Sequence, residues 1–215
     1  MSEESRLREE ICLLGKSLFD RGLTHGATGN LSARLSDDTL LVTPTGHALS
    51  RLDPALISKI DKQGQVVSGP KPTKEVPLHQ AFYETRNGTG AVAHLHSCHA
   101  VALSLMPDID PEDMLPPLTA YGLMLLGRVK LLPFFLPGDT AIGDAIRGLA
   151  GKRSAVMLAH HGPVVAGRDI EAAVNAIEEL EASARLALLT RHANPIMLRA
   201  EEISALVKKF DIDMG

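Results

Sequence analysis

The chain has 215 residues, of which 45% are hydrophobic and 22% are charged, and its formal net charge is −4. This composition is typical of a globular protein and argues against intrinsic disorder. Because lysine and arginine are scattered among acidic residues, without a basic block, we expect no nucleic acid partner.

The N-terminal half is predicted to contain one helix followed by short strands. Leucine and isoleucine recur at helical spacing between residues 5 and 20, which predicts an amphipathic helix. A glycine-rich loop then leads into the polar segment NLSARL and an apolar run at 40–42, and a hairpin is the simplest arrangement of the two. A second strand pair is expected at 57–60 and 65–67, around the turn residues between them.

The rest of the chain alternates helices and strands in no regular order. The predicted elements are a helix at 74–86, a buried strand at 91–96, a helix at 97–105, a buried strand at 154–159 and a long helix at 170–188. The proline-rich segment 106–137 gives no clear prediction. With no internal repeat and no linker, the pattern indicates a single α/β domain spanning residues 1–215.

Two features bear on the location of the protein. The first ten residues, MSEESRLREE, are charged and lack the apolar core of a secretory signal. The longest nearly apolar stretch, 121–137, is interrupted by charged residues and ends in prolines, so it does not span a bilayer. Cys12 and Cys98 are expected to pack as small apolar residues and not to pair, and a thiol nucleophile or metal ligand is the alternative for Cys98. We therefore expect a cytoplasmic protein without a membrane role.

Three histidines crowd into the stretch AVAHLHSCHA. On a strand, residues two apart share a face, so His94 and His96 point the same way. Two imidazoles in this arrangement can converge on one metal ion, and a catalytic zinc takes three protein ligands and keeps one position open. The alternative is a pair of histidines held by hydrogen bonds. On an apolar strand we favour the metal site.

Further ligand candidates lie in two other motifs. In MLAHHGPVVAG, His160 and His161 follow an apolar strand, and at most one of them is expected to reach the ion because successive strand residues point to opposite faces. The glycine after them allows a close approach of backbone or ligand. In KPTKEVPLH, Glu75 offers a carboxylate early in a helix, and a solvated helix-start acid is the alternative. His79, one turn further, is expected on the helix face.

The loops GATGN and TPTG place glycine beside threonine and asparagine. Backbone amides and hydroxyls in such turns can surround an anion such as phosphate. Glycine turns of this kind are also common in proteins without a phosphate site, so an ordinary pair of turns is the alternative interpretation.

Together these motifs resemble the class II aldolase/adducin family, typified by fuculose-phosphate aldolase and ribulose-phosphate 4-epimerase. The resemblance covers almost the entire chain, and it rests on the order and spacing of GATGNLSARL, LLVTPTG, KPTKE, AVAHLHS and MLAHHGPVVAG. It implies an α/β fold, namely a three-layer αβα sandwich around a central, mainly antiparallel sheet. It also implies a homotetramer with active sites at subunit interfaces.

The resemblance implies roles for individual residues. It implies one divalent metal per subunit, commonly zinc, with Mn²⁺ or Co²⁺ as alternatives, bound by Glu75, His94, His96 and His161. It implies a phosphate pocket formed by Gly29, Asn30, Thr45, Gly46, Thr73 and Lys74. The adducin branch has lost the metal ligands, so their presence here argues against a purely structural protein. We expect a phosphorylated sugar or sugar acid as the substrate.

Two positions depart from the pattern of the family's aldolases. Ala27 stands where the aldolase prototype has a phosphate-binding threonine, and whether Thr28 compensates stays open. Lys74 stands where sugar-phosphate aldolases and epimerases have a small hydroxyl residue. The form KPTKE looks more like the subgroup that decarboxylates 3-oxo-tetronate 4-phosphates to dihydroxyacetone phosphate and CO2.

This decarboxylation, through a metal-stabilised enediolate, is the leading interpretation. The alternative is a class II aldolase acting on fuculose or rhamnulose phosphate, or a ribulose-phosphate 4-epimerase. Under either interpretation Glu75 is the candidate acid and base, because it can leave the metal when substrate chelates it. Tyr121 aligns with a tyrosine that relatives use near the reacting carbons, and a buried structural tyrosine is the alternative for it.

Overall fold

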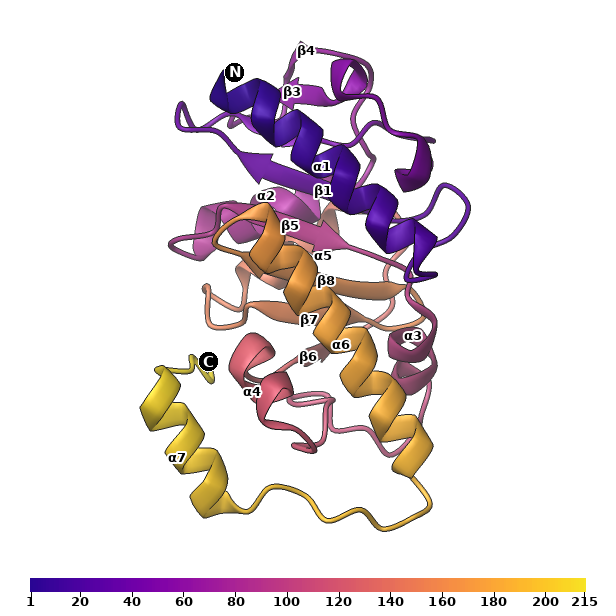
Figure 1. Cartoon of the computed structure of the whole chain (residues 1–215), viewed down its shortest axis with the longest axis vertical. Coiled ribbons are helices and arrows are strands. Elements are labelled where there is room, and N and C mark those ends of the chain that lie inside the picture. The colour runs from indigo at the N-terminus through magenta and orange to yellow at the C-terminus, as the bar shows by residue number, and fades with distance from the viewer.

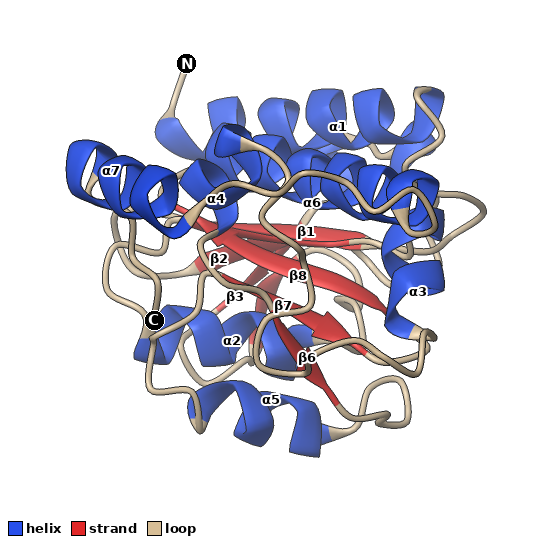
Figure 2. Cartoon of the chain, turned by 90° about the horizontal axis from the view of Figure 1, so that it is seen from below, coloured by secondary structure: helices blue, strands red, loops and turns tan.

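The computed structural model describes residues 1–215 and places one eight-stranded sheet between two layers of helices (Figure 1, Figure 2). The strand order is β4-β3-β2-β1-β5-β8-β7-β6, and every neighbouring pair is antiparallel except β6 and β7. The strands are β1 (Asn30–Arg34), β2 (Leu40–Val42), β3 (Ser58–Ile60), β4 (Val66–Ser68), β5 (Ala91–His94), β6 (Lys130–Leu132), β7 (Ala155–Leu158) and β8 (Gly162–Gly167). The predicted three-layer αβα sandwich with a mainly antiparallel sheet is confirmed.

The helices divide unequally between the two faces of the sheet (Figure 2). One face is covered by α1 (Glu3–Asp20), α3 (Cys98–Ser104), α4 (Ala120–Leu126), α6 (Ile170–Thr190) and α7 (Ala200–Phe210). The other is covered by α2 (Val76–Thr85) and α5 (Thr140–Arg147). Two short 3-10 helices, η1 (Leu49–Arg51) and η2 (Pro54–Leu56), connect β2 to β3. None of the helices combines the length and apolarity needed to cross a bilayer.

Two hydrophobic cores lie on the two sides of the sheet, and the central strand β5 contributes to both. Ala91 and Ala93 pack in the larger core beneath α1 and α6. Val92 packs in the smaller core beneath α2 and α5. Because side chains alternate along a strand, His94 follows Val92 onto the α2 side. The alternation therefore directs the first histidine of the HxH motif toward the start of α2, where Glu75 lies.

Several predicted elements need corrected boundaries. The helix expected at 74–86 begins at Val76, because Glu75 takes the N-cap position and Pro77 sits in the first turn. The strand expected at 91–96 ends at His94, so His96 follows the strand instead of lying on it. The unassigned segment 106–137 contains α4 and β6. The strand β8 was not predicted, because its apolar run is short and interrupted by glycine and proline.

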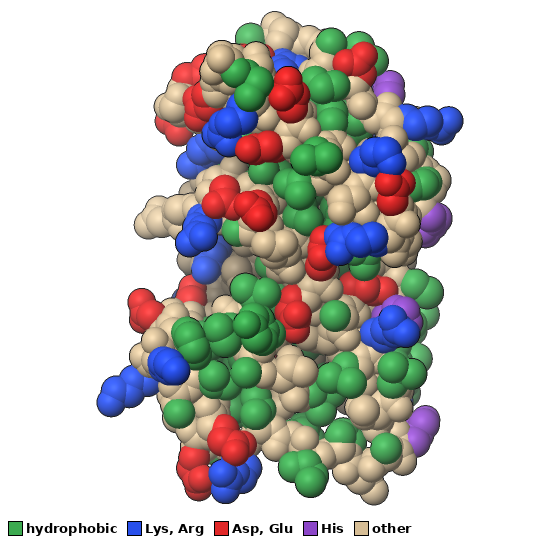
Figure 3. Space-filling view, viewed as in Figure 1, with side chains coloured by type: hydrophobic (Ala, Val, Ile, Leu, Met, Phe, Trp, Pro, Cys, Tyr) green, Lys and Arg blue, Asp and Glu red, His purple; other side chains and the backbone are tan.

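The surface mixes charge and apolar groups. On the face shown in Figure 3, acidic and basic side chains are interspersed, and they form no continuous basic surface there. Cys12 is half-buried, but Cys98 is exposed at the start of α3, so the expectation that Cys98 packs in the interior was wrong. Neither thiol is paired in a disulfide.

Candidate metal centre and adjoining cavity

Four predicted ligands converge on one point at the end of β5. The ligand atoms of Glu75, His94, His96 and His161 all lie within 4.8 Å of one another. The three imidazole rings are mutually close, with centroids 5.0 Å apart for His94 and His96, 4.9 Å for His94 and His161, and 4.7 Å for His96 and His161. Residues from three separate segments thus form one compact cluster.

A close approach between β8 and the end of β5 brings His161 into the cluster. A Cβ atom added to Gly162 would lie 2.0 Å from the carbonyl oxygen of Leu95, so only glycine permits this approach. The preceding residue, His160, has a positive φ of 60° and is exposed, and its ring lies 6.3 Å from that of Phe134. One histidine of the pair reaches the cluster and the other does not, as predicted, but the reason differs: both lie in the turn between β7 and β8 and not on a strand.

Glu75 reaches the cluster from the N-cap position of α2. The backbone N–H of Glu75 donates to the hydroxyl of Thr73 at 3.2 Å, which fixes the turn before the helix. The side-chain amide of Asn30 donates to Oε2 of Glu75 at 2.7 Å. Since Glu75 is buried, the alternative of a solvated acid at a helix start is wrong.

The buried donors fit a metal ion. Nδ1 of His94 lies 2.9 Å from the carbonyl oxygen of Pro163, so Nδ1 carries the proton and Nε2 presents its lone pair to the cluster. Four buried atoms of the cluster have no hydrogen-bond partner: Nε2 of His94, Oε1 of Glu75 and both ring nitrogens of His161. Burial of such atoms is costly unless another group satisfies them. Imidazoles with one carboxylate are a donor set that zinc and similar divalent ions prefer.

The protonation states suit metal binding as well. Burial lowers the pKa of His96 to about 3 and also lowers the pKa of His94, so both imidazoles are neutral near pH 7. Burial acts to raise the pKa of Glu75, but His94, His161 and the Asn30 amide outweigh it and hold that pKa below its usual range. Metal ligands must be deprotonated, and these groups meet that condition.

A cavity of about 260 Å³ opens beside the cluster. Its wall contains His96, His161 and every residue expected in a phosphate pocket: Gly29, Asn30, Thr45, Gly46, Thr73 and Lys74. Gly29 and Gly46 have φ of +80° and +75°, conformations that glycine adopts without strain. The two glycine loops and the metal cluster therefore share one cavity.

The polar side chains of the cavity wall differ in whether they already form hydrogen bonds or ion pairs within the chain. Lys74 is exposed and forms no ion pair with a carboxylate of the chain. It is therefore an unpaired cation on the cavity wall. Asn30 is engaged, because its nitrogen donates to Glu75 and its oxygen faces Nε2 of His79 at 2.5 Å. The hydroxyl of Thr28 donates to the carbonyl of His25 at 2.6 Å and so serves its own loop.

Tyr121 is the one predicted site residue that the structure does not bring to the cluster. It lies on α4, on the opposite face of the sheet from α2, and its side chain is 65% exposed. It does not line the cavity. The alternative of a buried structural tyrosine therefore does not hold either, and within one chain Tyr121 faces solvent.

His79 was expected on the face of the helix without a role at the site, and it is completely buried. Its ring bridges the hydroxyl of Ser32, 2.7 Å from Nδ1, and the side chain of Asn30. The signal that could have found it is its spacing of four residues from Glu75, since residues four apart on a helix share a face.

Comparison with known proteins gives a consistent set of relatives. The profile of the Class II Aldolase and Adducin N-terminal domain matches residues 9–188. The 3-oxo-tetronate 4-phosphate decarboxylase of Cupriavidus necator is 47% identical over 186 residues, 86% of this chain and 85% of that protein. The enzyme of the same name from Pectobacterium atrosepticum is 41% identical, covering 96% and 94%. The crystal structure of YgbL from Escherichia coli superposes with a TM-score of 0.93 at 40% identity, covering 95% and 99%.

Proposed function

Because the chain belongs to the class II aldolase/adducin family, we propose that it is a metal-dependent decarboxylase that converts 3-oxo-tetronate 4-phosphate to dihydroxyacetone phosphate and CO2. It is therefore a carbon–carbon lyase. The observation in the structure that carries the choice of substrate is the unpaired Lys74 on the wall of the cavity that also contains the metal cluster and the glycine loops.

The substrate carries two anionic groups, a carboxylate at one end and a phosphate at the other. The backbone amides around Gly29 and Gly46 suit the phosphate. Lys74 adds a full positive charge to the same cavity, which favours a sugar acid phosphate over a ketose phosphate that has only one anionic group. We propose that residues 1–215 form a single domain that holds all these groups.

We propose one Zn²⁺ ion per subunit, with Mn²⁺ or Co²⁺ as alternatives, held by Glu75, His94, His96 and His161. When bound, the ion would supply Lewis-acid stabilisation of the negative charge that is left as CO2 departs from C2. The C2–carboxylate bond breaks and its electron pair passes to the C2–C3 enediolate. A proton must then be delivered to C2 to give dihydroxyacetone phosphate.

Glu75 is the first candidate for passing on that proton, because its carboxylate lies in the cluster and borders the cavity. It is ionised at rest, so it must first leave the metal and take up a proton before it can deliver one to C2. Tyr121 is the second. It faces solvent, so it can serve only the site of a neighbouring subunit, and we propose a homotetramer with active sites at subunit interfaces. Large apolar side chains exposed on the chain support association: Leu125, Phe134, Leu136 and Ile196. Free, unpaired cysteines support a cytoplasmic location.

The test is to measure CO2 and dihydroxyacetone phosphate release from 3-oxo-tetronate 4-phosphate by zinc-loaded protein, with fuculose 1-phosphate as the parallel substrate. Equal amounts of CO2 and dihydroxyacetone phosphate, without an aldehyde, are expected. Aldehyde release from fuculose 1-phosphate, with no CO2 from the sugar acid, would make the chain an aldolase and refute the proposal.

A further inference from the structure

A buried chain of hydrogen bonds runs behind the metal cluster, between the sheet and α2. It begins at Glu75, whose Oε2 accepts from Asn30 at 2.7 Å. Asn30 Oδ1 lies 2.5 Å from Nε2 of His79, and Nδ1 of His79 lies 2.7 Å from the hydroxyl of Ser32. That hydroxyl lies 2.8 Å from the hydroxyl of Tyr83. All five side chains are buried.

The chain has one direction that satisfies every member. The Glu75 carboxylate only accepts, so Asn30 turns its NH2 toward it and its oxygen toward His79. Nε2 of His79 must then carry the proton, which leaves Nδ1 to accept from Ser32, and Ser32 accepts from Tyr83. Burial lowers the pKa of His79 to about 3, which agrees with a neutral ring. Each donor in the chain therefore points toward the metal cluster.

We propose that His79 is a positioning residue for the metal-binding carboxylate. Its Nε2–H holds the Asn30 amide in the orientation that donates to Oε2 of Glu75. This leaves Oε1, which is buried and has no hydrogen-bond partner, directed toward His161 at 3.1 Å. Outer partners of this kind orient metal ligands and tune the affinity for the metal. The proposal rests on the metal centre of the proposed function, but not on the choice of substrate.

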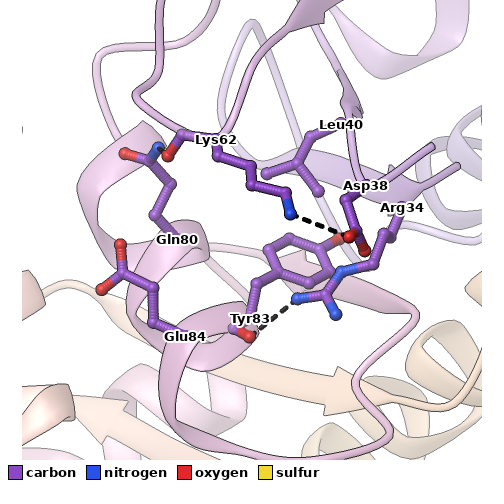
Figure 4. A pocket seen from close by; sticks show the side chains of 7 residues that line it. All are labelled: Arg34, Asp38, Leu40, Lys62, Gln80, Tyr83 and Glu84. Atoms are coloured by element: carbon purple, nitrogen blue, oxygen red, sulfur yellow. Dashed lines mark hydrogen bonds and ion pairs between the residues drawn. The ribbon is translucent and has the colours of Figure 1, made fainter.

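Charged residues surround the outer end of the chain at Tyr83, which lines a surface pocket together with them (Figure 4). Arg34 lies over the ring of Tyr83, 4.9 Å from its centroid, and donates to the backbone carbonyl of Tyr83 at 2.7 Å. Beside it, Lys62 and Asp38 form an ion pair at 2.9 Å. Tyr83 is only 8% exposed beneath these groups, and limited access of water strengthens the hydrogen bonds of the chain.

The test measures metal binding in three variants of the whole protein. His79→Leu removes both ring nitrogens, whereas His79→Gln keeps an N–H donor near the position of Nε2. Phe82→Leu is the matched control, because Phe82 is buried in the same helix and the same core but lies outside the chain. The readouts are Co²⁺ and Zn²⁺ affinity by chelator competition, the visible spectrum of the Co²⁺-loaded protein, and unfolding of the metal-free protein.

His79→Leu is expected to weaken metal binding by about 10–100-fold and to change the Co²⁺ spectrum. His79→Gln should restore most of the affinity, and Phe82→Leu should lose stability while keeping the wild-type affinity and spectrum. Wild-type affinity and spectrum in folded His79→Leu would overturn the proposal, as would an equal loss of affinity in Phe82→Leu.

Ser32→Ala decides the matter if His79→Leu does not fold. It removes the hydroxyl that donates to Nδ1 and accepts from Tyr83 but leaves the His79 ring in place. Weaker metal binding with a changed Co²⁺ spectrum supports the proposal, and unchanged binding overturns it. A wild-type protein that binds neither Co²⁺ nor Zn²⁺ would instead refute the metal centre, and with it the proposed function. The two failures are therefore distinguishable.

Discussion

The substitution Gly162→Ala tests how tightly the fold sets the geometry of the metal centre. The added Cβ would lie 2.0 Å from the carbonyl oxygen of Leu95, and real Cβ atoms essentially never approach closer than 3.0 Å. The start of β8 must therefore move away from the end of β5 by at least 1.0 Å (3.0 − 2.0). Overpacking of this kind costs about 1–3 kcal/mol, occasionally more.

The same displacement reaches the ligands directly. His161 precedes Gly162 in the chain, and His94 and His96 flank Leu95. It also pulls the Pro163 carbonyl away from Nδ1 of His94, 2.9 Å distant. Metal–ligand distances tolerate only about 0.2 Å of change, so we expect zinc affinity to fall by about 10–100-fold, as when an outer partner of a ligand is lost.

Zinc affinity is measured by competition with a chelating dye, and stability by urea unfolding of the metal-free protein. Gly148→Ala is the control, because Gly148 has an ordinary φ of −59° at the end of α5, and a Cβ there would be 3.3 Å from the nearest backbone oxygen. We expect this control to change stability by less than about 1 kcal/mol. Unchanged zinc affinity in Gly162→Ala would show that the backbone approach does not set the ligand geometry.

Three further predictions concern the reaction. His94→Ala should abolish CO2 release, whereas Lys74→Ala should lower kcat/KM by roughly 10–100-fold, which is the effect of losing one charged contact. Steady-state kinetics of the two variants provide the comparison. Turnover by metal-free His94→Ala would contradict the mechanism. Chelator treatment should stop the reaction and lower the Tm, because a ligand that binds only the folded state stabilises it, and recovery on adding zinc is the check. Tyr121→Phe should lower kcat by about 10²–10⁴-fold with little change in KM; an unchanged kcat would remove Tyr121 from proton transfer.

Local patterns in the sequence indicated candidates for the metal site, and the resemblance to the class II aldolase/adducin family implied the three layers and the full ligand set. The alternation of Ala91, Val92 and Ala93 with His94 places the histidine on one face of a buried strand, since side chains two apart point the same way. The spacing of His96 from His94 indicated a second imidazole, and the family resemblance implied His161 as the third. The glycine loops before β1 and after β2 indicated the anion site. Each of these signals lies within a few consecutive residues, so it can be recognised without knowledge of the tertiary structure.

The tertiary structure alone decided which distant groups meet. Asn30, Glu75 and His79 are joined through pairings 45 and 49 residues apart, and these depend on how α2 lies on the sheet. The approach of Gly162 to Leu95 depends likewise on the pairing of β5 with β8. Periodicity determines the face on which a side chain lies, but not its partner across elements, because that partner is fixed by strand register and helix packing.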